Sequence, residues 1–401
     1  MPTTTPQYLQ EVEQYSAHNY HPLPVVLAKG EGCWVWDVEG KKYCDMLSAY
    51  SALNQGHRHP KIIAALVEQA EKLTLTSRAF HNDQMGPFLR ELCETTGFEN
   101  ALLMNSGAEA VETALKAARR WGYRVKGVPA DRAEIICCQN NFHGRTISVI
   151  SFSTEAAYRE GFGPFTPGFT IVPYGDAEAI ARAITPHTVA VLVEPIQGEG
   201  GVIIPPAGYL QALRALCTQH QVLFMADEIQ TGLGRTGRLF ACEHDGVRPD
   251  LVIIGKALSG GCYPVSAVVA SRAIMDAAFE PGNHGSTFGG NPLACAIGRA
   301  ALGVIRDERL SERAAELGTY FLGELKKIQA ACVETVRGRG LLIGVEIKKS
   351  YGKARPYCER LFADGILAKE THDQVIRFAP PLVIDRETID WALPKIAKIL
   401  Q

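Results

Sequence analysis

The stretch between residues 222 and 261 constrains the fold of this chain most strongly. It holds two short apolar runs, at 222–226 and 251–254, and polar or glycine residues stop each of them. Short runs of large aliphatic residues that end in this way are typical of strands in a parallel sheet covered on both faces. Ligands bind beyond the carboxyl ends of the strands in such sheets. We therefore expect three polar side chains on the ligand side of one α/β sheet: Asp227, Gln230 and Lys256.

An acid and a lysine that leave neighbouring strands in this way have a specific chemical use. A lysine amine can bind pyridoxal 5′-phosphate as a Schiff base, and an acid can pair with the protonated pyridine nitrogen of that cofactor. Taken one at a time, both residues have ordinary interpretations, Lys256 as a solvated loop lysine and Asp227 as a helix cap. The hypothesis therefore depends on whether other parts of the chain fit the same cofactor.

A second feature is the start of a helix that is predicted to run from residue 107 to about residue 123. Ser106 and Glu109 have the spacing of a capping box. Gly107 leaves the amides of the first turn uncovered, and free N–H groups at the positive end of a helix dipole favour a phosphate. An ordinary capped helix explains these residues equally well.

Further strands are predicted to end at the same edge of the sheet. The run at 135–138 precedes Phe142, an aromatic that can stack on a planar ring, and Arg145, which can bind a carboxylate through two hydrogen bonds. Runs at 147–152 and 189–193 are also expected to be strands, and a helix at 209–220 follows them. This repetition of strand and helix predicts a parallel sheet.

Residues 232–237 match the pattern G-x-G-x-x-G, which in other proteins marks dinucleotide binding. That fingerprint requires the glycine turn to follow a strand directly and to open a helix. Here residues 227–231 intervene, and residues 238–246 have no helical stripe of apolar residues. We therefore do not expect a nicotinamide or flavin cofactor.

The C-terminal part of the chain predicts a separate small α+β domain. A glycine-rich stretch at 284–292 is a plausible boundary, and helices near 293–305 and 311–329 precede strands at 342–347 and 375–378. Arg377 lies in the last of these apolar runs, so it must be paired or must bind a ligand.

Composition excludes several other classes of function. The 401 residues are 46% hydrophobic and 21% charged, which is typical of a globular protein, and the net charge of -2 predicts neither a nucleic-acid surface nor a membrane surface. Eleven cysteines lack C-x-x-C spacing, and residues 1–20 lack an apolar signal core or an arginine, so a cytoplasmic location is expected. His57 and His59 have no third ligand nearby, so no metal site is expected.

With these residues in view, the chain resembles the class III, fold-type I pyridoxal-phosphate-dependent aminotransferases. The resemblance runs over nearly the whole chain, from residues 17–20 to 377–380. Five segments carry it: Ser77–Phe80, Asn105–Gly107, Val193–Glu199, Ala226–Gly232 and Gly255–Gly261. It implies a large domain with a mostly parallel seven-stranded sheet between helices, at 45–285, and a small α+β domain at 286–401. Residues 1–44 are expected to pack with the small domain.

The resemblance also implies roles at a cofactor site. Lys256 forms the internal aldimine and, once released as a neutral amine, shuttles the proton between substrate and cofactor. Asp227 keeps the pyridine nitrogen protonated. Gln230 binds the phenolic oxygen and Phe142 stacks on the ring. The phosphate is expected at Ser106, Gly107 and Ala108, and Thr287 is expected to reach it from the partner subunit of a homodimer.

Within the class, the chain is most similar to the members that transfer the δ-amino group of ornithine to 2-oxoglutarate. The resemblance then implies that Arg145 binds the α-carboxylate of ornithine and Tyr20 its α-amine, while Tyr50 favours ornithine over 4-aminobutyrate. Arg377 is expected to bind the α-carboxylate of glutamate, with Glu199 paired to it during the ornithine half-reaction.

Three alternatives remain open at this stage. Acetylornithine and 4-aminobutyrate aminotransferases share most of the same segments, and a catalytically silent scaffold protein is a more remote interpretation. His143 stands where the animal ornithine enzymes have tryptophan, which bears on substrate preference. A fixed salt bridge is the structural alternative for Glu199.

Overall fold

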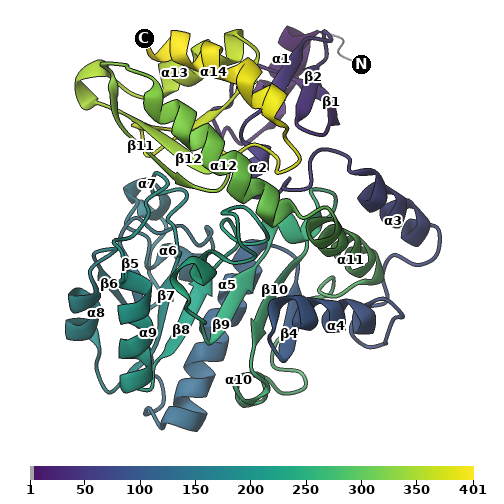
Figure 1. The fold of residues 1–401 in the computed structure, drawn as a ribbon. Coiled ribbons are helices and arrows are strands. Elements are labelled where there is room, and N and C mark those ends of the chain that lie inside the picture. Colours follow the sequence, from purple (N-terminus) through teal and green to yellow (C-terminus); the bar gives the residue numbers. More distant parts are fainter. Residues whose placement is uncertain (1–3) are drawn as a thin grey trace.

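A seven-stranded sheet is the centre of the structure, which is a computed structural model that describes residues 4–401 (Figure 1). Six strands run in one direction and β10 runs against both of its neighbours. The order across the sheet is β4 (Asn100–Met104), β10 (Ser266–Ala270), β9 (Leu251–Ile254), β8 (Leu223–Asp227), β7 (Thr188–Val193), β5 (Glu134–Cys138) and β6 (Phe169–Val172).

Helices bury both faces of this sheet, which explains why apolar residues of its central strands point to both sides. In β8, Leu223 and Met225 pack in one hydrophobic cluster with helix α5 (Gly107–Trp121). Phe224 and Ala226 pack on the opposite face with helix α9 (Tyr209–Gln219). The expected α/β fold class, with a mostly parallel sheet between helices, is confirmed.

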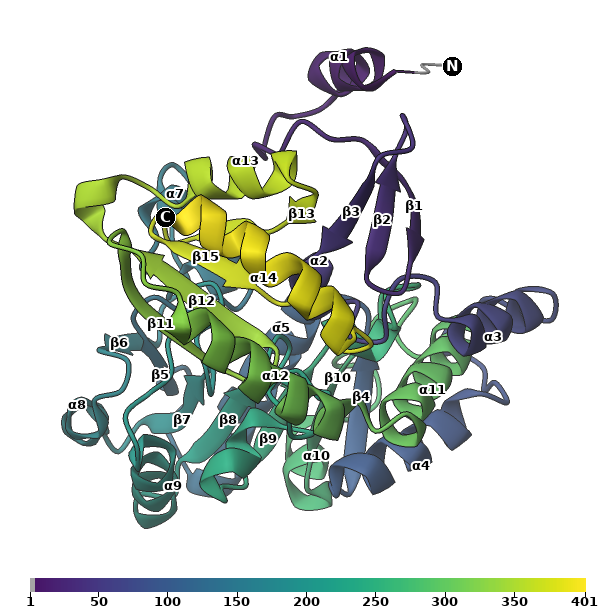
Figure 2. The same cartoon turned by 45° about the horizontal axis from the view of Figure 1, so that its top comes forward.

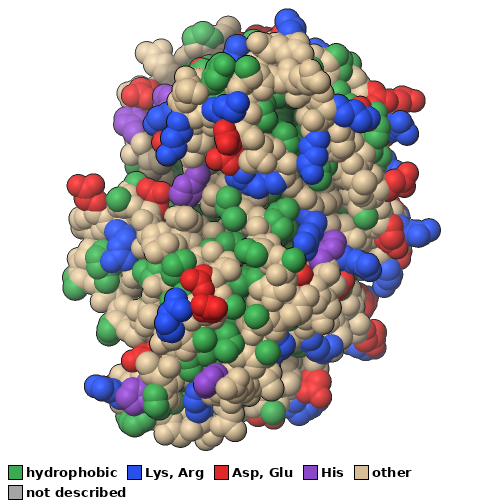
Figure 3. Space-filling model, turned by 60° about the vertical axis from the view of Figure 1, so that its left-hand side comes forward, with side chains coloured by type: hydrophobic (Ala, Val, Ile, Leu, Met, Phe, Trp, Pro, Cys, Tyr) green, Lys and Arg blue, Asp and Glu red, His purple; other side chains and the backbone are tan. Residues whose placement is uncertain are grey.

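Further helices belong to the same part of the chain as the large sheet. Their bounds are α3 (Pro60–Ala70), α4 (Met85–Thr96), α6 (Ile147–Ile150), α7 (Ala156–Arg159), α8 (Ala177–Ala183), α10 (Arg272–Ala278) and α11 (Pro292–Asp307). Basic and acidic side chains are intermixed on the side of the molecule drawn in Figure 3, and neither sign forms a continuous patch there.

Two smaller sheets lie above the large one (Figures 1 and 2). One is antiparallel, in the order β11 (Val333–Arg339), β12 (Leu342–Ile347), β15 (Val375–Phe378) and β14 (Lys369–Thr371). The other joins the two ends of the chain, in the order β1 (Leu27–Glu31), β2 (Trp34–Asp37), β3 (Lys42–Asp45) and β13 (Ile366–Leu367). Four helices complete this region: α1 (Thr5–Tyr15), α12 (Leu310–Lys327), α13 (Arg355–Ala363) and α14 (Arg386–Leu400). Residues 1–3 of the expected N-terminal segment lie outside the described residues.

One predicted element is wrong. Residues 147–150 form the short helix α6 and not a strand, so β5 pairs directly with β7 and β6 forms the edge. The run is rich in β-branched residues, which favour strands, but a short apolar run can also be one buried helical turn. Val149 and Ile150 face the core while Ile147 is exposed, as one helical turn permits.

The glycines of the 232–237 loop serve packing between backbones. A Cβ atom on Gly237 would lie 2.9 Å from Cα of Ala315 in α12. The same helix touches the β11–β12 hairpin, where a Cβ atom on Gly318 would lie 2.1 Å from the carbonyl carbon of Gly340. No α-helix opens at this loop, so the context required for dinucleotide binding is absent among the described residues. Within residues 4–401, no helix has both the length and the hydrophobicity to cross a bilayer.

The close approach at Gly318 gives a stability prediction. Gly318→Ala should destabilise the protein by about 1–3 kcal/mol, because backbone atoms cannot move aside as a flexible side chain can. Gly323→Ala is the matched control on the same helix, since its Cβ atom would meet nothing within 4 Å. That control should gain up to about 1 kcal/mol from helix propensity. Urea unfolding of the two variants measures the difference, and equal stabilities would contradict the packing argument.

Candidate active site

Two neighbouring cavities lie where the large sheet meets the small antiparallel sheet, and Phe142 lines both. The inner chamber, of about 190 Å³, is lined by Gly107, Ala108, Phe142, His143, Gly144, Glu194, Ile196, Asp227, Ile229, Gln230, Thr231 and Lys256. The outer chamber, of about 460 Å³, is lined by Tyr20, Tyr50, Asn140, Asn141, Phe142, Arg145, Thr154, Glu155, Tyr158, Glu199 and residues 369–373. The carboxyl ends of β5, β7, β8 and β9 supply the inner chamber, as expected for a parallel sheet.

The first turn of α5 forms one wall of the inner chamber. Its capping box is present: the Ser106 hydroxyl accepts a hydrogen bond from the Glu109 amide at 3.2 Å, and the Glu109 carboxylate accepts one from the Ser106 amide at 2.7 Å. The amides of Gly107 and Ala108 have no partner within the helix and lie at its positive end. Both residues line the chamber, whereas Ser106 does not and uses its hydroxyl in the cap.

Asp227, the last residue of β8, is 4% exposed and forms a buried ion pair with His143. The two are joined by a 2.7 Å contact between Nδ1 of His143 and Oδ2 of the aspartate, while Oδ1 accepts the Ile229 amide at 3.0 Å. Burial alone would lower the pKa of His143, but the hydrogen bond and charge of Asp227 raise it above its ordinary value. The two side chains therefore hold each other in a fixed position at the end of β8.

A second buried carboxyl group stands beside this pair. Glu194 follows β7 directly, and its Oε2 accepts the backbone N–H of Phe142 at 2.9 Å. Burial raises the pKa of Glu194 to about 7, although the positive charge of His143 lowers it in part. The nearby charge of Asp227 adds to this rise, so Glu194 keeps its proton to a higher pH than an exposed glutamate does.

Lys256 lies two residues beyond the end of β9 and lines the same chamber as Asp227. Its φ of 43° is in the left-handed region, which a residue with a side chain seldom adopts and which occurs most often at functional sites. Burial lowers the pKa of Lys256 below its ordinary value, against the opposing effect of the Glu199 carboxylate. The net effect is that the amine of Lys256 loses its proton more readily than that of an exposed lysine.

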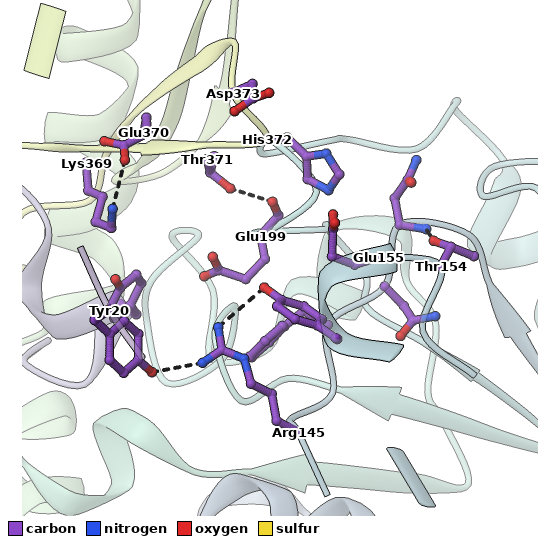
Figure 4. Close-up of a pocket in the computed structure, with 15 residues that line it drawn as sticks. Tyr20, Arg145, Thr154, Glu155, Glu199, Lys369, Glu370, Thr371, His372 and Asp373 are labelled. Carbon is purple, nitrogen blue, oxygen red and sulfur yellow. Dashed lines mark hydrogen bonds and ion pairs between the residues drawn. The ribbon is translucent and has the colours of Figure 1, made fainter. Parts of the chain in front are cut away.

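The outer chamber has an arginine at its lower wall (Figure 4). Arg145 donates from Nη1 to the Tyr20 hydroxyl at 2.9 Å and from Nη2 to the Tyr158 hydroxyl at 3.4 Å. Its guanidinium carbon also lies 5.6 Å from the centre of the Phe142 ring and 4.7 Å from that of Tyr158. Tyr20 is 64% exposed, so this end of the chamber opens to solvent.

A second arginine belongs to the small antiparallel sheet. Arg377 in β15 is 1% exposed and donates from Nη1 to Glu199 at 2.6 Å and to Gln230 at 3.3 Å. Its guanidinium carbon lies 4.9 Å from the centre of the Tyr50 ring. Burial alone would raise the pKa of Glu199, but Arg377 and Lys256 lower it to about 2. Nε and Nη2 of Arg377 are buried and have no hydrogen-bond partner among the described residues.

The structure thus brings together most residues that the sequence singled out. Eleven line the two chambers or contact a residue that does: Tyr20, Tyr50, Gly107, Ala108, Phe142, Arg145, Glu199, Asp227, Gln230, Lys256 and Arg377. Ser106 and Thr287 line neither, and Thr287 is exposed at the surface of the chain.

Sequence reasoning missed three features of the site. His143 was considered only for substrate preference, and its contact with Asp227 in the inner chamber was not predicted. Tyr158 contacts Arg145 and carries no motif. Residues 369–373 line the outer chamber, and the Thr371 hydroxyl donates a hydrogen bond to the Glu199 carbonyl. His372 and Asp373 have left-handed φ angles, and no residue pattern in the sequence predicts this turn.

A lysine with a lowered pKa opposite a buried, paired carboxylate is the arrangement of an aminotransferase site. The family model for aminotransferase class-III matches residues 15–400, and the chain belongs to this family. The enzymes of this class depend on pyridoxal 5′-phosphate.

The most similar relatives narrow the class further. The chain is 60% identical over 395 residues to an ornithine aminotransferase of Geobacillus sp. (strain WCH70), covering 98% of both chains, and 59% identical to one of Bacillus subtilis (strain 168), again covering 98% of both. Among solved structures, an ornithine aminotransferase from Toxoplasma gondii ME49 superposes with a TM-score of 0.98 at 48% identity, covering 100% of this chain and 95% of that one. An acetylornithine aminotransferase from Elizabethkingia anophelis has a TM-score of 0.90 at 49% identity, covering 100% and 99%.

The raised pKa of Glu194 predicts a pH-dependent stability. Between the ordinary value of 4.5 and about 7, the unfolded chain loses the Glu194 proton while the folded chain keeps it. Stability contributed at this position therefore falls as pH rises through that window. Glu194→Gln removes the titration, so its stability relative to the unchanged protein should rise by on the order of 3 kcal/mol between pH 4.5 and 8. Urea unfolding across that range measures the gap, and a gap that stays constant with pH would refute the assignment.

Proposed function

We propose that this protein transfers the δ-amino group of L-ornithine to 2-oxoglutarate, giving glutamate-5-semialdehyde and glutamate by a ping-pong mechanism. The observation that carries the proposal is a pair of arginines: Arg145 lines the outer chamber, and Arg377 binds Glu199, which lines it too. Arg145 is held by tyrosine hydroxyls, whereas Arg377 is covered by a carboxylate. Two arginines with different partners suit an enzyme that takes one substrate with two amines and another with two carboxylates.

The inner chamber fits pyridoxal 5′-phosphate. The unpartnered first-turn amides of α5 suit a phosphate, Phe142 offers an aromatic face, and the Asp227 carboxylate suits a protonated ring nitrogen. Gln230 would bind the phenolic oxygen, and Lys256 would hold the cofactor covalently through Nζ. When bound, the cofactor supplies an electron sink for the substrate carbon that loses its proton.

The chain itself must place and move protons around that carbon. Lys256 Nζ would take the proton from the substrate carbon and pass it to the cofactor. The amine must be neutral to accept that proton. The burial that lowers its pKa supports this role. Asp227, paired with His143, would hold the proton on the pyridine nitrogen.

Substrate choice would follow from the outer chamber. Arg145 would bind the α-carboxylate of ornithine and Tyr20 its α-amine, with Tyr50 at the wall between the two sheets. Glutamate needs an arginine for its own α-carboxylate, and the two unpaired donors of Arg377 form a fork that suits one. Glu199 would cover Arg377 while ornithine reacts and release it for glutamate.

Acetylornithine is the second candidate donor, because an enzyme named for it is 49% identical over the whole chain. A 4-aminobutyrate donor is disfavoured by Tyr20 and Tyr50 together at the outer chamber. A silent scaffold is disfavoured because the lysine, the aspartate and the arginine all line the chambers.

Three further expectations belong to the proposal. The protein is a homodimer in which Thr287, exposed in one chain, reaches the phosphate of its partner. The chain divides into the segments 1–44, 45–285 and 286–401, as the pairing of β3 with β13 and the change of sheets support. It acts in the cytoplasm, which the eleven free cysteines support.

A donor screen tests the function. Purified protein is mixed with ornithine, acetylornithine, lysine or 4-aminobutyrate, and the change in cofactor absorbance gives the rate of each half-reaction. Ornithine should react fastest. Lys256→Ala is the control and should leave no rapid reaction with any donor. A faster reaction with acetylornithine would replace the proposal with the second candidate.

Glu199 gives a sharper test of how ornithine is presented. Glu199→Gln leaves the Arg377 charge without its carboxylate, so donors that present an α-amine and α-carboxylate gain access. The ratio of rates for ornithine and for glutamate should fall about tenfold or more, the size expected for a lost hydrogen bond between charged groups.

Glu370→Gln is the matched control, because Glu370 lines the same chamber but pairs with Lys369 and Arg355. It should leave the ratio unchanged. Stopped-flow half-reactions measure both variants. An unchanged ratio in Glu199→Gln would mean that Glu199 forms only a fixed salt bridge.

A further inference from the structure

Tyr50 is carried by a turn with an unusual backbone. Ser48, Ala49, Tyr50 and Ser51 all have positive φ, at 47°, 46°, 60° and 73°, in the short element α2 (Ser48–Ser51). Residues with a Cβ atom avoid this region, and none of the four is glycine or asparagine. Such strain persists only where the surrounding structure enforces it, and it is concentrated at functional sites.

Hydrogen bonds from two sides hold this turn. Asp45 Oδ1 accepts the amides of Leu47 and Ser48 at 2.9 and 2.8 Å. On the other side, the Ser48 hydroxyl donates to the Ala379 carbonyl at 2.6 Å and accepts from Nη2 of Arg235 at 2.9 Å. The same Nη2 donates to Asn54 at 2.7 Å, just beyond the turn.

Arg235 also binds the small antiparallel sheet. Its Nη1 donates to the carbonyls of Pro380 and Leu341, at 2.6 and 2.9 Å. Pro380 lies three residues beyond Arg377 on the same strand end, and Leu341 precedes β12, the neighbour of that strand. The guanidinium of Arg235 thus joins the turn that carries Tyr50 to the strand that carries Arg377. The guanidinium carbon of Arg377 lies 4.9 Å from the centre of the Tyr50 ring.

The chemistry of this contact requires arginine. Arg235 is 0% exposed, and no carboxylate lies within ion-pair distance of it among the described residues. Burial lowers its pKa to about 9, which still leaves it charged at neutral pH. Its four partners lie around one planar fork, and lysine, with its donors on a single atom, cannot reach them all.

The loop that presents Arg235 is the one whose sequence imitates a dinucleotide motif. Gly234 and Gly237 have φ values of 94° and 92°, and a Cβ atom on Gly237 would meet the backbone of α12. These glycines let the loop enter the junction between the two sheets with its arginine pointing inward. The G-x-G-x-x-G pattern therefore has a structural purpose that its usual meaning does not include.

We propose that Arg235 is a positioning residue that fixes Tyr50 against Arg377 and thereby sets the donor preference of the enzyme. The inference rests on the proposed function, since it assigns Arg235 an effect on the choice between ornithine and 4-aminobutyrate. Arg235 itself touches neither chamber. Any effect of Arg235 on donor preference must therefore pass through the left-handed turn. This effect can be measured separately from the contribution of Arg235 to stability.

The test compares Arg235→Lys with Arg313→Lys. Arg313 is the matched control: it is partly buried and donates to the carbonyls of Ile384 and Val383, in the segment that follows the same strand, and it has no hydrogen bond to the turn. Arg235→Lys should lower the ratio of kcat/KM for ornithine to that for 4-aminobutyrate about tenfold, the size expected for lost hydrogen bonds to a charged group. Arg313→Lys should leave the ratio unchanged, whatever its melting temperature.

A double-mutant cycle with Tyr50→Leu shows whether the effect passes through Tyr50. In the Tyr50→Leu background, Arg235→Lys should change the ratio no further. Independent, multiplying effects would overturn the proposal, as would an unchanged ratio in Arg235→Lys with only a lower melting temperature. If Arg235→Lys does not fold, Ser48→Ala decides, because it removes the hydroxyl that Arg235 binds and should lower the ratio in the same direction.

A crystal structure of Arg235→Lys, or of Ser48→Ala if the first does not fold, separates this inference from the proposed function. Residues 48–51 should leave the left-handed region, and this readout does not depend on which donor the enzyme uses. If the donor screen rejects ornithine but the turn relaxes, the function falls and the positioning role stands. A turn that keeps its φ angles without the Arg235 contact overturns the positioning role.

Discussion

The buried carboxylate of Asp227 is the group on which the rest of the site depends. A charge at the end of a strand inside the protein is costly unless it is paired and hydrogen-bonded. His143 supplies the opposite charge and the Ile229 amide a second hydrogen bond. The inner chamber therefore presents a buried carboxylate that is held in place at both of its oxygens. Because β7 and β9 flank β8, the same geometry delivers Glu194 and Lys256 to that chamber.

Charge separates the two chambers into different chemical environments. In the inner one, the Asp227–His143 pair balances itself, Glu194 holds its proton up to about pH 7, and burial favours the neutral amine of Lys256. In the outer one, Glu199 balances Arg377, and Arg145 has only hydroxyl and aromatic partners among the described residues. Proton transfer would thus occur next to a locally neutral set of groups, while anionic substrates would meet arginines further out.

The sequence predicted the parts of this site that depend on local order along the chain. Strand ends predicted Asp227 and Lys256, and the capping box predicted the start of α5, because both signals lie within a few residues. The contact between His143 and Asp227 joins residues 84 positions apart, and the pairing of β3 with β13 joins the two ends of the chain, so no local pattern reports them. The left-handed turn at 48–51 contains no glycine, so the sequence did not predict it. The β-branched residues of α6 favoured a strand, and the structure has a helix there.

The outer chamber is lined by segments that lie far apart in the chain, and the proposed function uses this arrangement to take two unlike substrates. Arg145 follows a strand of the large sheet, whereas Arg377 and residues 369–371 belong to the small one, so the two arginines proposed to bind carboxylates are fixed to different sheets. Glu199 lies on a loop of the large sheet but is held from the small one, by Arg377 and by the Thr371 hydroxyl. A carboxylate that competes with substrate for an arginine needs such a tie, because a loosely held one would leave the buried guanidinium uncompensated. Under the proposed function, alternation between donors would require only the movement of the Glu199 side chain, with the backbone of its loop kept in place.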